Sequence, residues 1–300
     1  MPPDESSVLV EGPWRHRDVT AGGLRFHVAE AGPADGPLVL LLHGFPEFWW
    51  SWRHQLTAFA EAGFHAVAPD LRGYGATDKP PRGYDAYTLS ADVAGLVRAL
   101  GARDAHLVGH DWGGYLAWAT ATLHPRVVNR LSVLAIPHPT RMRQEVLKAG
   151  AQARASSYIS GFQVPRVPER RLVTGGLVGE LMRRWAGPGF PDLETEARCT
   201  EALQIPAAAH CALEYYRWSV RSLTRPSGLR YYRLLEPGVQ VPVLHLHGAL
   251  DACILRSTVE GSEQWARAGY ALQVVDGVGH FLHEEAPDRV TAALLAHAGA

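Results

Sequence analysis

Six short apolar runs, separated by segments with helical spacing, most strongly constrain how this chain of 300 residues can fold. The runs cover residues 38–44, 65–70, 105–111, 130–136, 241–248 and 271–277. They are continuously apolar, which is typical of strands that are covered on both faces of a parallel sheet. Helical spacing over residues 89–102 and 115–123 supplies the crossovers that parallel strands require. The pattern predicts an α/β fold with a mostly parallel sheet flanked by helices.

The alternation of strands and helices is lost between residues 137 and 235. This stretch has a largely helical pattern and carries fifteen Lys and Arg against eight Asp and Glu. We therefore predict a core formed by residues 1–136 and 236–300, interrupted by a helical cap over residues 137–235. We expect the excess positive charge to lie on a solvated outer face, with an anionic partner as the alternative.

Composition excludes several classes of function. The net charge of −1 gives no electrostatic reason to expect a nucleic-acid partner, and no apolar run has the length of a membrane helix. The acidic N-terminus lacks the plan of a signal peptide. Three cysteines without CxxC spacing suggest free thiols in the cytoplasm rather than disulfides or a zinc site. We expect a cytoplasmic monomer or homodimer that uses no metal and no cofactor.

A turn of small residues around Asp111 follows one of the apolar runs directly. In Gly109-His110-Asp111-Trp112-Gly113, the spacing is that of a sharp turn that raises its central side chain above the sheet as a nucleophile. The backbone N–H of Trp112 would then face an oxyanion. The alternative is that Asp111 only caps the next helix.

Further groups suited to catalysis follow other strands, where the carboxyl ends of parallel strands gather. Phe45, just after an early strand, can supply a second oxyanion donor through its backbone N–H. Asp251 and His280 follow the last two runs, and the order nucleophile, acid, histidine is that of hydrolases with this fold. Asp276 is a rival acid, which we expect to point away from His280.

The chain resembles the epoxide hydrolases of the α/β-hydrolase superfamily. The resemblance rests on the segments HGFPE at 43–47, DLRGYG at 70–75 and GHDWGG at 109–114, together with Asp251 and His280. It implies an α/β-hydrolase fold with a helical cap, and a reaction in which Asp111 is the nucleophile, His280 the base and Asp251 its orienting acid. We interpret Asp70 and Arg72 as structural residues that hold loops.

An aspartate nucleophile changes the chemistry that is expected. A carboxylate is already ionised at neutral pH and suits displacement at a saturated carbon, which gives an alkyl ester. Water activated by His280 would then hydrolyse that ester. The resemblance therefore implies an epoxide hydrolase that converts a small apolar epoxide and water into a vicinal diol. The alternatives are a haloalkane dehalogenase with the same nucleophile and, less favoured, a binding protein without catalysis.

The leaving group distinguishes the two enzymes. In the epoxide hydrolases two cap tyrosines polarise the ring oxygen, and the resemblance assigns these roles to Tyr158 and Tyr216. Adjacent Tyr215 would face another direction on a helix, and His210 is an alternative donor. The haloalkane dehalogenases, which the chain resembles at Trp112, use a second halide ligand. For that role the sequence offers only the tryptophans of the stretch 45–52.

We expect the substrate pocket to be lined by His43, Pro46, Trp49, His110 and His138. The alternative for the histidines is a structural role. The alternative for the aromatic stretch 45–52 is packing in the core, which is the more frequent fate of such side chains.

Overall fold

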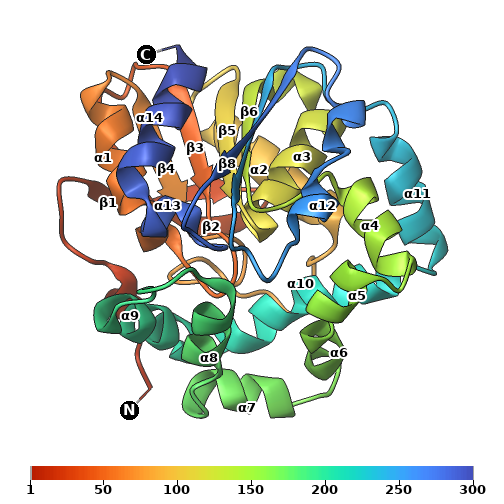
Figure 1. Cartoon of the computed structure of the whole chain (residues 1–300). Coiled ribbons are helices and arrows are strands. Elements are labelled where there is room, and N and C mark those ends of the chain that lie inside the picture. Colours follow the sequence, from red (N-terminus) through yellow and green to blue (C-terminus); the bar gives the residue numbers. More distant parts are fainter. Residues whose placement is uncertain (1, 300) are drawn as a thin grey trace.

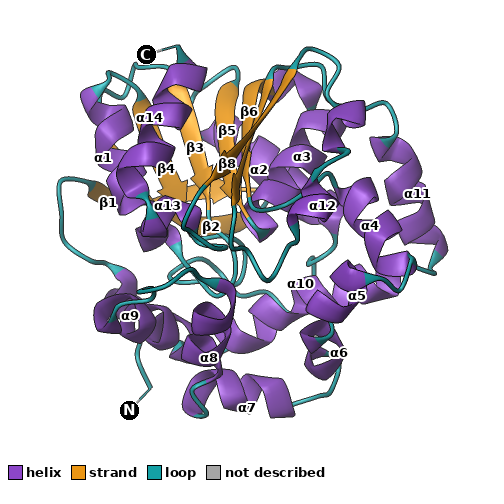
Figure 2. Ribbon diagram, in the orientation of Figure 1, coloured by secondary structure: helices purple, strands orange, loops and turns teal. Residues whose placement is uncertain are grey.

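A single eight-stranded sheet forms the centre of the computed structural model, which describes residues 2–299 (Figures 1 and 2). The strands follow the spatial order β1-β2-β4-β3-β5-β6-β7-β8, with β2 antiparallel to both its neighbours and all other pairs parallel. Their bounds are Arg15–Ala21 (β1), Leu24–Ala31 (β2), Leu38–Leu42 (β3), His65–Pro69 (β4), Ala105–His110 (β5), Val128–Leu134 (β6), Val243–Gly248 (β7) and Tyr270–Val275 (β8). The predicted α/β fold with a mostly parallel sheet is confirmed.

All six apolar runs form strands, and the sequence pattern missed only the N-terminal hairpin of β1 and β2. β1 lies at the sheet edge and exposes most of its residues, so it lacks an apolar run. The signal that could have revealed the hairpin is the Gly22-Gly23 turn, in which both glycines have positive φ. Polar residues placed at the ends of the predicted strands, such as His43 and Asp111, lie in the turns that follow.

Four long helices cover the two faces of the sheet: α1 (Arg53–Glu61), α2 (Ala86–Ala99), α3 (Trp112–Leu123) and α14 (Pro287–Ala298). α1 packs against α14, and α2 packs against α3 (Figure 1). α2 begins three residues before the predicted start, because the Asp85 side chain caps it by accepting a hydrogen bond from the N–H of Thr88 at 3.0 Å. Short elements complete the core: α12 (Arg256–Val259), α13 (Leu282–Glu285), and the 3₁₀ turns Glu5–Val8, Trp49–Trp52, Pro125–Val127 and Ser262–Trp265.

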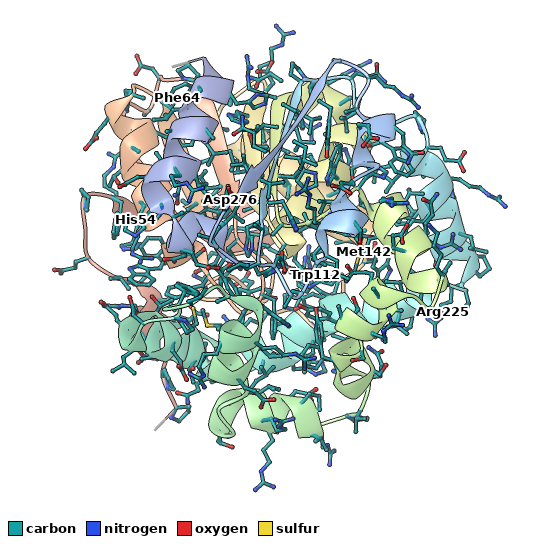
Figure 3. All side chains as sticks on the ribbon, viewed as in Figure 1. His54, Phe64, Trp112, Met142, Arg225 and Asp276 are labelled. Atoms are coloured by element: carbon teal, nitrogen blue, oxygen red, sulfur yellow. The ribbon has the colours of Figure 1, made fainter. Side chains whose placement is uncertain are left out.

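Eight helices lie between β6 and β7, and most of them cover the carboxyl edge of the sheet, whereas the last lies beside the core against α3 (Figure 1). They are α4 (Pro139–Leu147), α5 (Ala151–Ala155), α6 (Tyr158–Phe162), α7 (Val167–Thr174), α8 (Leu177–Trp185), α9 (Leu193–Gln204), α10 (Ala208–Ser222) and α11 (Pro226–Leu235). In Figure 3, Trp112 lies at the level where the core meets these helices. Among the described residues, none of the helices combines the length and apolar character that a membrane crossing requires.

Two buried charged residues, Asp70 and Arg72, hold loops in place near this edge, as expected from the sequence. Asp70 accepts hydrogen bonds from the N–H groups of Trp49 and Ala76, both at 3.0 Å. Arg72 makes a two-point pair with Asp92 of α2, at 2.6 and 2.8 Å. Because both charges are buried with their partners, they fix the loop without an uncompensated desolvation cost.

Candidate active site

Asp111 occupies a strained turn between β5 and α3. Its φ of 48° and ψ of −117° are rare for a residue with a side chain, and such strain often marks a functional site. Glycines make this turn possible, because a Cβ at Gly113 would overlap the carbonyl oxygen of Leu42 and one at Gly109 would overlap that of Gly113. The turn therefore holds the Asp111 side chain in one place at the carboxyl edge of the sheet.

The Asp111 carboxylate makes no capping hydrogen bond to α3, so the capping alternative is wrong. It accepts a hydrogen bond instead from the backbone N–H of Phe45, with Oδ1 at 3.0 Å. Trp112 is the first residue of α3, where a backbone N–H has no acceptor within the helix. Both predicted oxyanion donors thus belong to residues next to the carboxylate, one in the loop after β3 and one in α3.

His280 lies between two carboxylates. Its Nδ1 donates to Oδ2 of Asp251 at 2.8 Å, and its Nε2 lies 3.6 Å from Oδ2 of Asp111. Asp251 is itself held, since its Oδ1 accepts from the N–H groups of Cys253 and Ile254 at 2.8 and 2.9 Å. The structure therefore brings Asp111, Asp251 and His280 together from three separate strand ends.

The rival acid Asp276 is exposed, and its backbone carbonyl accepts a hydrogen bond from Arg289. As expected, it does not contact His280.

The two carboxylates favour the charged form of His280. Burial opposes protonation, but Asp251, with a contribution from the hydrogen bond to Asp111, holds the pKa of His280 well above its usual value. Protonation of His280 is therefore favoured in the resting site. Any change that removes the charge of Asp111 lowers this pKa.

A buried hydrogen-bond network holds His280 in place and includes Glu47, whose role the sequence did not reveal. His110 donates from Nδ1 to Glu47 at 2.8 Å and from Nε2 to the carbonyl oxygen of His280 at 2.9 Å. Burial opposes ionisation of Glu47, yet the adjacent His110 and His283 hold its pKa well below the usual range. Each ring nitrogen of His110 thus faces a hydrogen-bond acceptor. This network fixes the backbone of His280.

The same three side chains are also a possible metal-ligand group within the part of the chain that the structure describes. The donor atoms of Glu47, His110 and His283 lie within 4.8 Å of one another, and all three residues are buried. Both ring nitrogens of His110 are committed to hydrogen-bond acceptors, so neither offers a lone pair to a metal. The contacts fit a hydrogen-bond network better than a metal site.

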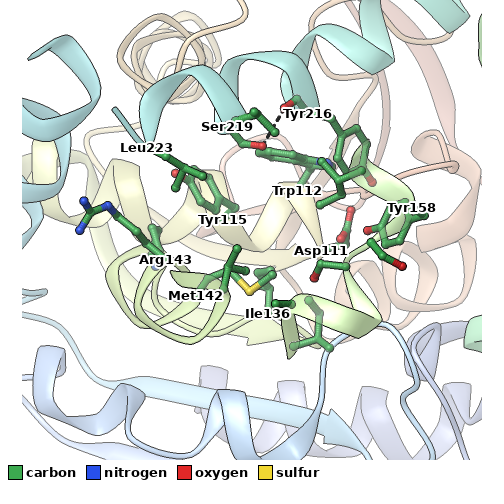
Figure 4. Close-up of a pocket in the computed structure, with 18 of the residues that line it drawn as sticks. Asp111, Trp112, Tyr115, Ile136, Met142, Arg143, Tyr158, Tyr216, Ser219 and Leu223 are labelled. Carbon is green, nitrogen blue, oxygen red and sulfur yellow. Dashed lines mark hydrogen bonds between the residues drawn. The ribbon is translucent and has the colours of Figure 1, made fainter. Parts of the chain in front are cut away.

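A cavity of about 310 Å³ opens beside Asp111, between the core and the helical insertion (Figure 4). Tyr158 of α6 and Tyr216 of α10 both line it. The Tyr158 hydroxyl lies 3.6 Å from Sγ of Cys253, and the buried Tyr216 hydroxyl makes no hydrogen bond within residues 2–299. Burial, with the nearby charge of Asp111 adding to it, raises the pKa of both phenols well above the usual value. Both hydroxyls are therefore protonated donors.

The two other candidate donors lie elsewhere. Tyr215 points away from this cavity and donates to the carbonyl oxygen of Arg72 at 2.8 Å, as its helix position predicts. His210 is not in the lining, because its exposed ring faces Glu169 and Arg217 at 3.3 Å each.

The prediction that His43, Pro46, Trp49, His110 and His138 line the pocket is wrong, since none of them lies in the cavity wall. His110 is committed to the network described above. The ring of His43 is turned into the core, where its Nε2 accepts from a backbone N–H at 3.0 Å. Pro46 lies in the loop after β3, directly after Phe45, whose N–H faces Asp111.

The remaining two residues are part of aromatic packing. Trp49 lies against Trp14 and donates from Nε1 to the carbonyl oxygen of Val8 at 2.7 Å. The ring of His138 stacks on Trp265, with ring centres 4.4 Å apart. Contacts between distant segments decide both positions, which explains why proximity in sequence to the catalytic loops misled the prediction.

The second halide ligand that a dehalogenase would need is also missing from the cavity wall. Trp112 lines the cavity, but Trp50 and Trp52 do not. The guanidinium of Arg53 covers the Trp50 ring at 3.6 Å, and the ring of Trp52 packs on His283 at 4.4 Å.

Comparisons with known proteins find likenesses over most of the chain. A model described as "Alpha/beta hydrolase family" matches residues 39–293. The chain is 35% identical over 286 residues to AB hydrolase superfamily protein YfhM of Bacillus subtilis, covering 92% of this chain and 95% of that protein. It is 33% identical over 309 residues to Epoxide hydrolase A of Mycobacterium tuberculosis, covering 93% and 95%. The crystal structure of Epoxide Hydrolase A from Mycobacterium thermoresistibile superimposes with a TM-score of 0.82 at 29% identity, covering 95% and 98%.

With Asp111 on its strained turn, His280 and Asp251 at neighbouring strand ends, and these likenesses over nearly its whole length, the chain belongs to the α/β hydrolase family and closely resembles the epoxide hydrolases within it.

Proposed function

We propose that this protein is an epoxide hydrolase that opens a small epoxide with water to give a vicinal diol. The observation that carries the proposal is the pair of protonated phenols, Tyr158 and Tyr216, in the wall of the cavity that contains Asp111. An alkoxide leaving group is strongly basic and needs such donors, whereas a halide does not. The helical insertion would then act as a cap that supplies both donors.

In the first step, Asp111 attacks a ring carbon through Oδ2. Oδ1 is held by the N–H of Phe45, so Oδ1 becomes the carbonyl oxygen of the ester. The carbon–oxygen bond of the ring breaks, its electron pair moves to the ring oxygen, and a tyrosine donates a proton to that oxygen. The product is a hydroxyalkyl ester on Asp111.

Before the second step, His280 passes the proton that it held at rest to the tyrosinate left by the first step, and so becomes neutral. Water then attacks the ester carbonyl carbon and His280 takes one of its protons. The N–H groups of Phe45 and Trp112 stabilise the tetrahedral oxyanion. The bond between that carbon and the alkyl oxygen then breaks, His280 returns the proton to the departing oxygen, and the diol leaves. The carboxyl proton left on Asp111 passes to His280, which restores the resting site. Asp251 keeps the imidazole oriented through the bond to Nδ1.

Replacing His280 tests the second step. In His280→Gln, alkylation of Asp111 still occurs, but ester hydrolysis slows by about 100-fold or more, as expected for loss of a general base. Intact-protein mass spectrometry after mixing with styrene oxide should then show one covalent adduct per chain. The double variant Asp111→Asn/His280→Gln should show none, and His124→Gln should turn over normally. Normal turnover by His280→Gln would refute the role of this base.

Replacing the tyrosines tests the first step and the choice of leaving group. Tyr216→Phe and Tyr158→Phe should each slow epoxide opening by about 100-fold, the usual cost of one donor to a developing oxyanion. Tyr215→Phe is the matched control, because its hydroxyl bonds to a backbone carbonyl outside the cavity. Pre-steady-state alkylation by styrene oxide and by 1-bromobutane measures the effect. Turnover of the bromide but not the epoxide would overturn the proposal in favour of a dehalogenase.

The charge of Asp111 should be visible in the titration of His280. The alkyl ester is neutral at this position, and Asp111→Asn imitates it. Since the Asp111 carboxylate contributes to the raised pKa of His280, that pKa should fall in the variant. NMR titration of ¹⁵N-labelled histidines measures it, with His124 as an internal reference that should not move. An unchanged or higher pKa for His280 would contradict the electrostatic account.

A further inference from the structure

The cavity beside Asp111 contains a second charged side chain. Asp111 and Arg143 are the two charged residues in its wall, and the rest of the wall is neutral. In Figure 4 they lie at opposite ends, with Tyr115 and Met142 between them. The cavity therefore has a nucleophile at one end and a cation at the other.

The helical spacing of α4 directs Arg143 inward. Met142 and Arg143 face the cavity, whereas Arg141 and Glu145 form an ion pair with each other. Leu223 of α10 lies in the wall near Arg143 (Figure 4). The walls between the two charged ends are thus suited to an alkyl chain.

The charge of Arg143 has no carboxylate partner within residues 2–299, unlike many arginines of the insertion. The residues Arg141, Arg171, Arg183, Arg198, Arg217 and Arg221 each pair with a glutamate. The half-buried Arg143 guanidinium instead lies 5.0 Å from the ring centre of Tyr232, and its buried Nε makes no hydrogen bond within the described chain.

A second polar group lies in the same wall. The Tyr115 hydroxyl is buried beside the hydroxyls of Tyr231 and Tyr232. A buried donor without a partner, such as Nε of Arg143, is costly and is usually satisfied by something that binds. Arg143 therefore offers donors to an anion at this end of the cavity.

We propose that Arg143 binds a carboxylate at the far end of the epoxide, so that the substrate is an epoxyalkanoate whose apolar chain spans the cavity. This inference rests on the proposed function of Asp111. A guanidinium can grip a carboxylate with two parallel hydrogen bonds, which also fixes the direction in which the chain enters. The arrangement keeps the carboxylate of the substrate away from Asp111 and presents the oxirane ring to Asp111.

A matched pair of substrates tests this assignment. A graded series of terminal epoxyalkanoates, each beside its methyl ester, is compared by kcat/KM in the wild type, Arg143→Met, Arg143→Lys and Arg154→Met. Arg143→Met should lower kcat/KM for the acids by about 10- to 100-fold, as expected for a lost charge-assisted pair, and lower the ratio of acid to ester accordingly. Arg143→Lys should fall between, because it keeps the charge but not the planar fork.

Arg154→Met is the matched control, since it removes one exposed positive charge from α5 outside the cavity wall. It should leave the ratio of acid to ester at the wild-type value. The assignment is overturned if Arg143→Met leaves that ratio unchanged, or if Arg154→Met lowers it equally.

Calorimetric binding of decanoate, which carries no epoxide, separates this inference from the proposed function. Decanoate should bind the wild type and lose about 10-fold or more in affinity in Arg143→Met. If it does so while no epoxide is hydrolysed, the proposed function fails and the carboxylate subsite stands. If the epoxides are hydrolysed but decanoate binds both proteins alike, the subsite fails and the proposed function stands.

Discussion

The hydrogen bond from the Phe45 N–H to Oδ1 of Asp111 is the contact on which the site depends, because it joins the turn after β3 to the turn after β5. It fixes which carboxylate oxygen is free to react. The backbone conformation of Asp111 is strained, and glycines that leave no room for a side chain make it accessible. One strained residue thus sets the position of the nucleophile and the direction in which a substrate must approach.

Charged and titratable side chains surround the Asp111 carboxylate. Asp251 holds His280 from one side, and the pair of Glu47 and His110 holds its backbone from another. In the proposed reaction the charge of Asp111 disappears when the ester forms, which weakens the hold of the site on the proton of His280. The first step would then prepare the base for the second.

The sequence predicted those parts of the molecule that depend on local pattern. Continuous apolar runs located six strands, and residues just after strand ends located Asp111, Asp251 and His280 because parallel strands bring such ends together. Long-range contacts decided the rest. The ring of His138 stacks on Trp265, more than a hundred residues away in the chain, and no local pattern predicts that. Glu47 carries no periodic signal in its loop, and the position of Arg143 depends on the packing of α4 against α11, whose Tyr232 ring lies 5.0 Å from its guanidinium.

A single turnover in oxygen-18 water, with enzyme in excess over styrene oxide, tests the covalent mechanism most directly. If water attacks the ester carbonyl, one labelled oxygen should enter the Asp111 carboxylate, and the first diol should carry unlabelled oxygen from the enzyme. Mass spectrometry of the peptide containing Asp111 and of the diol measures both. Label in the diol alone, with none in Asp111, would mean that water opens the epoxide directly and would contradict the account.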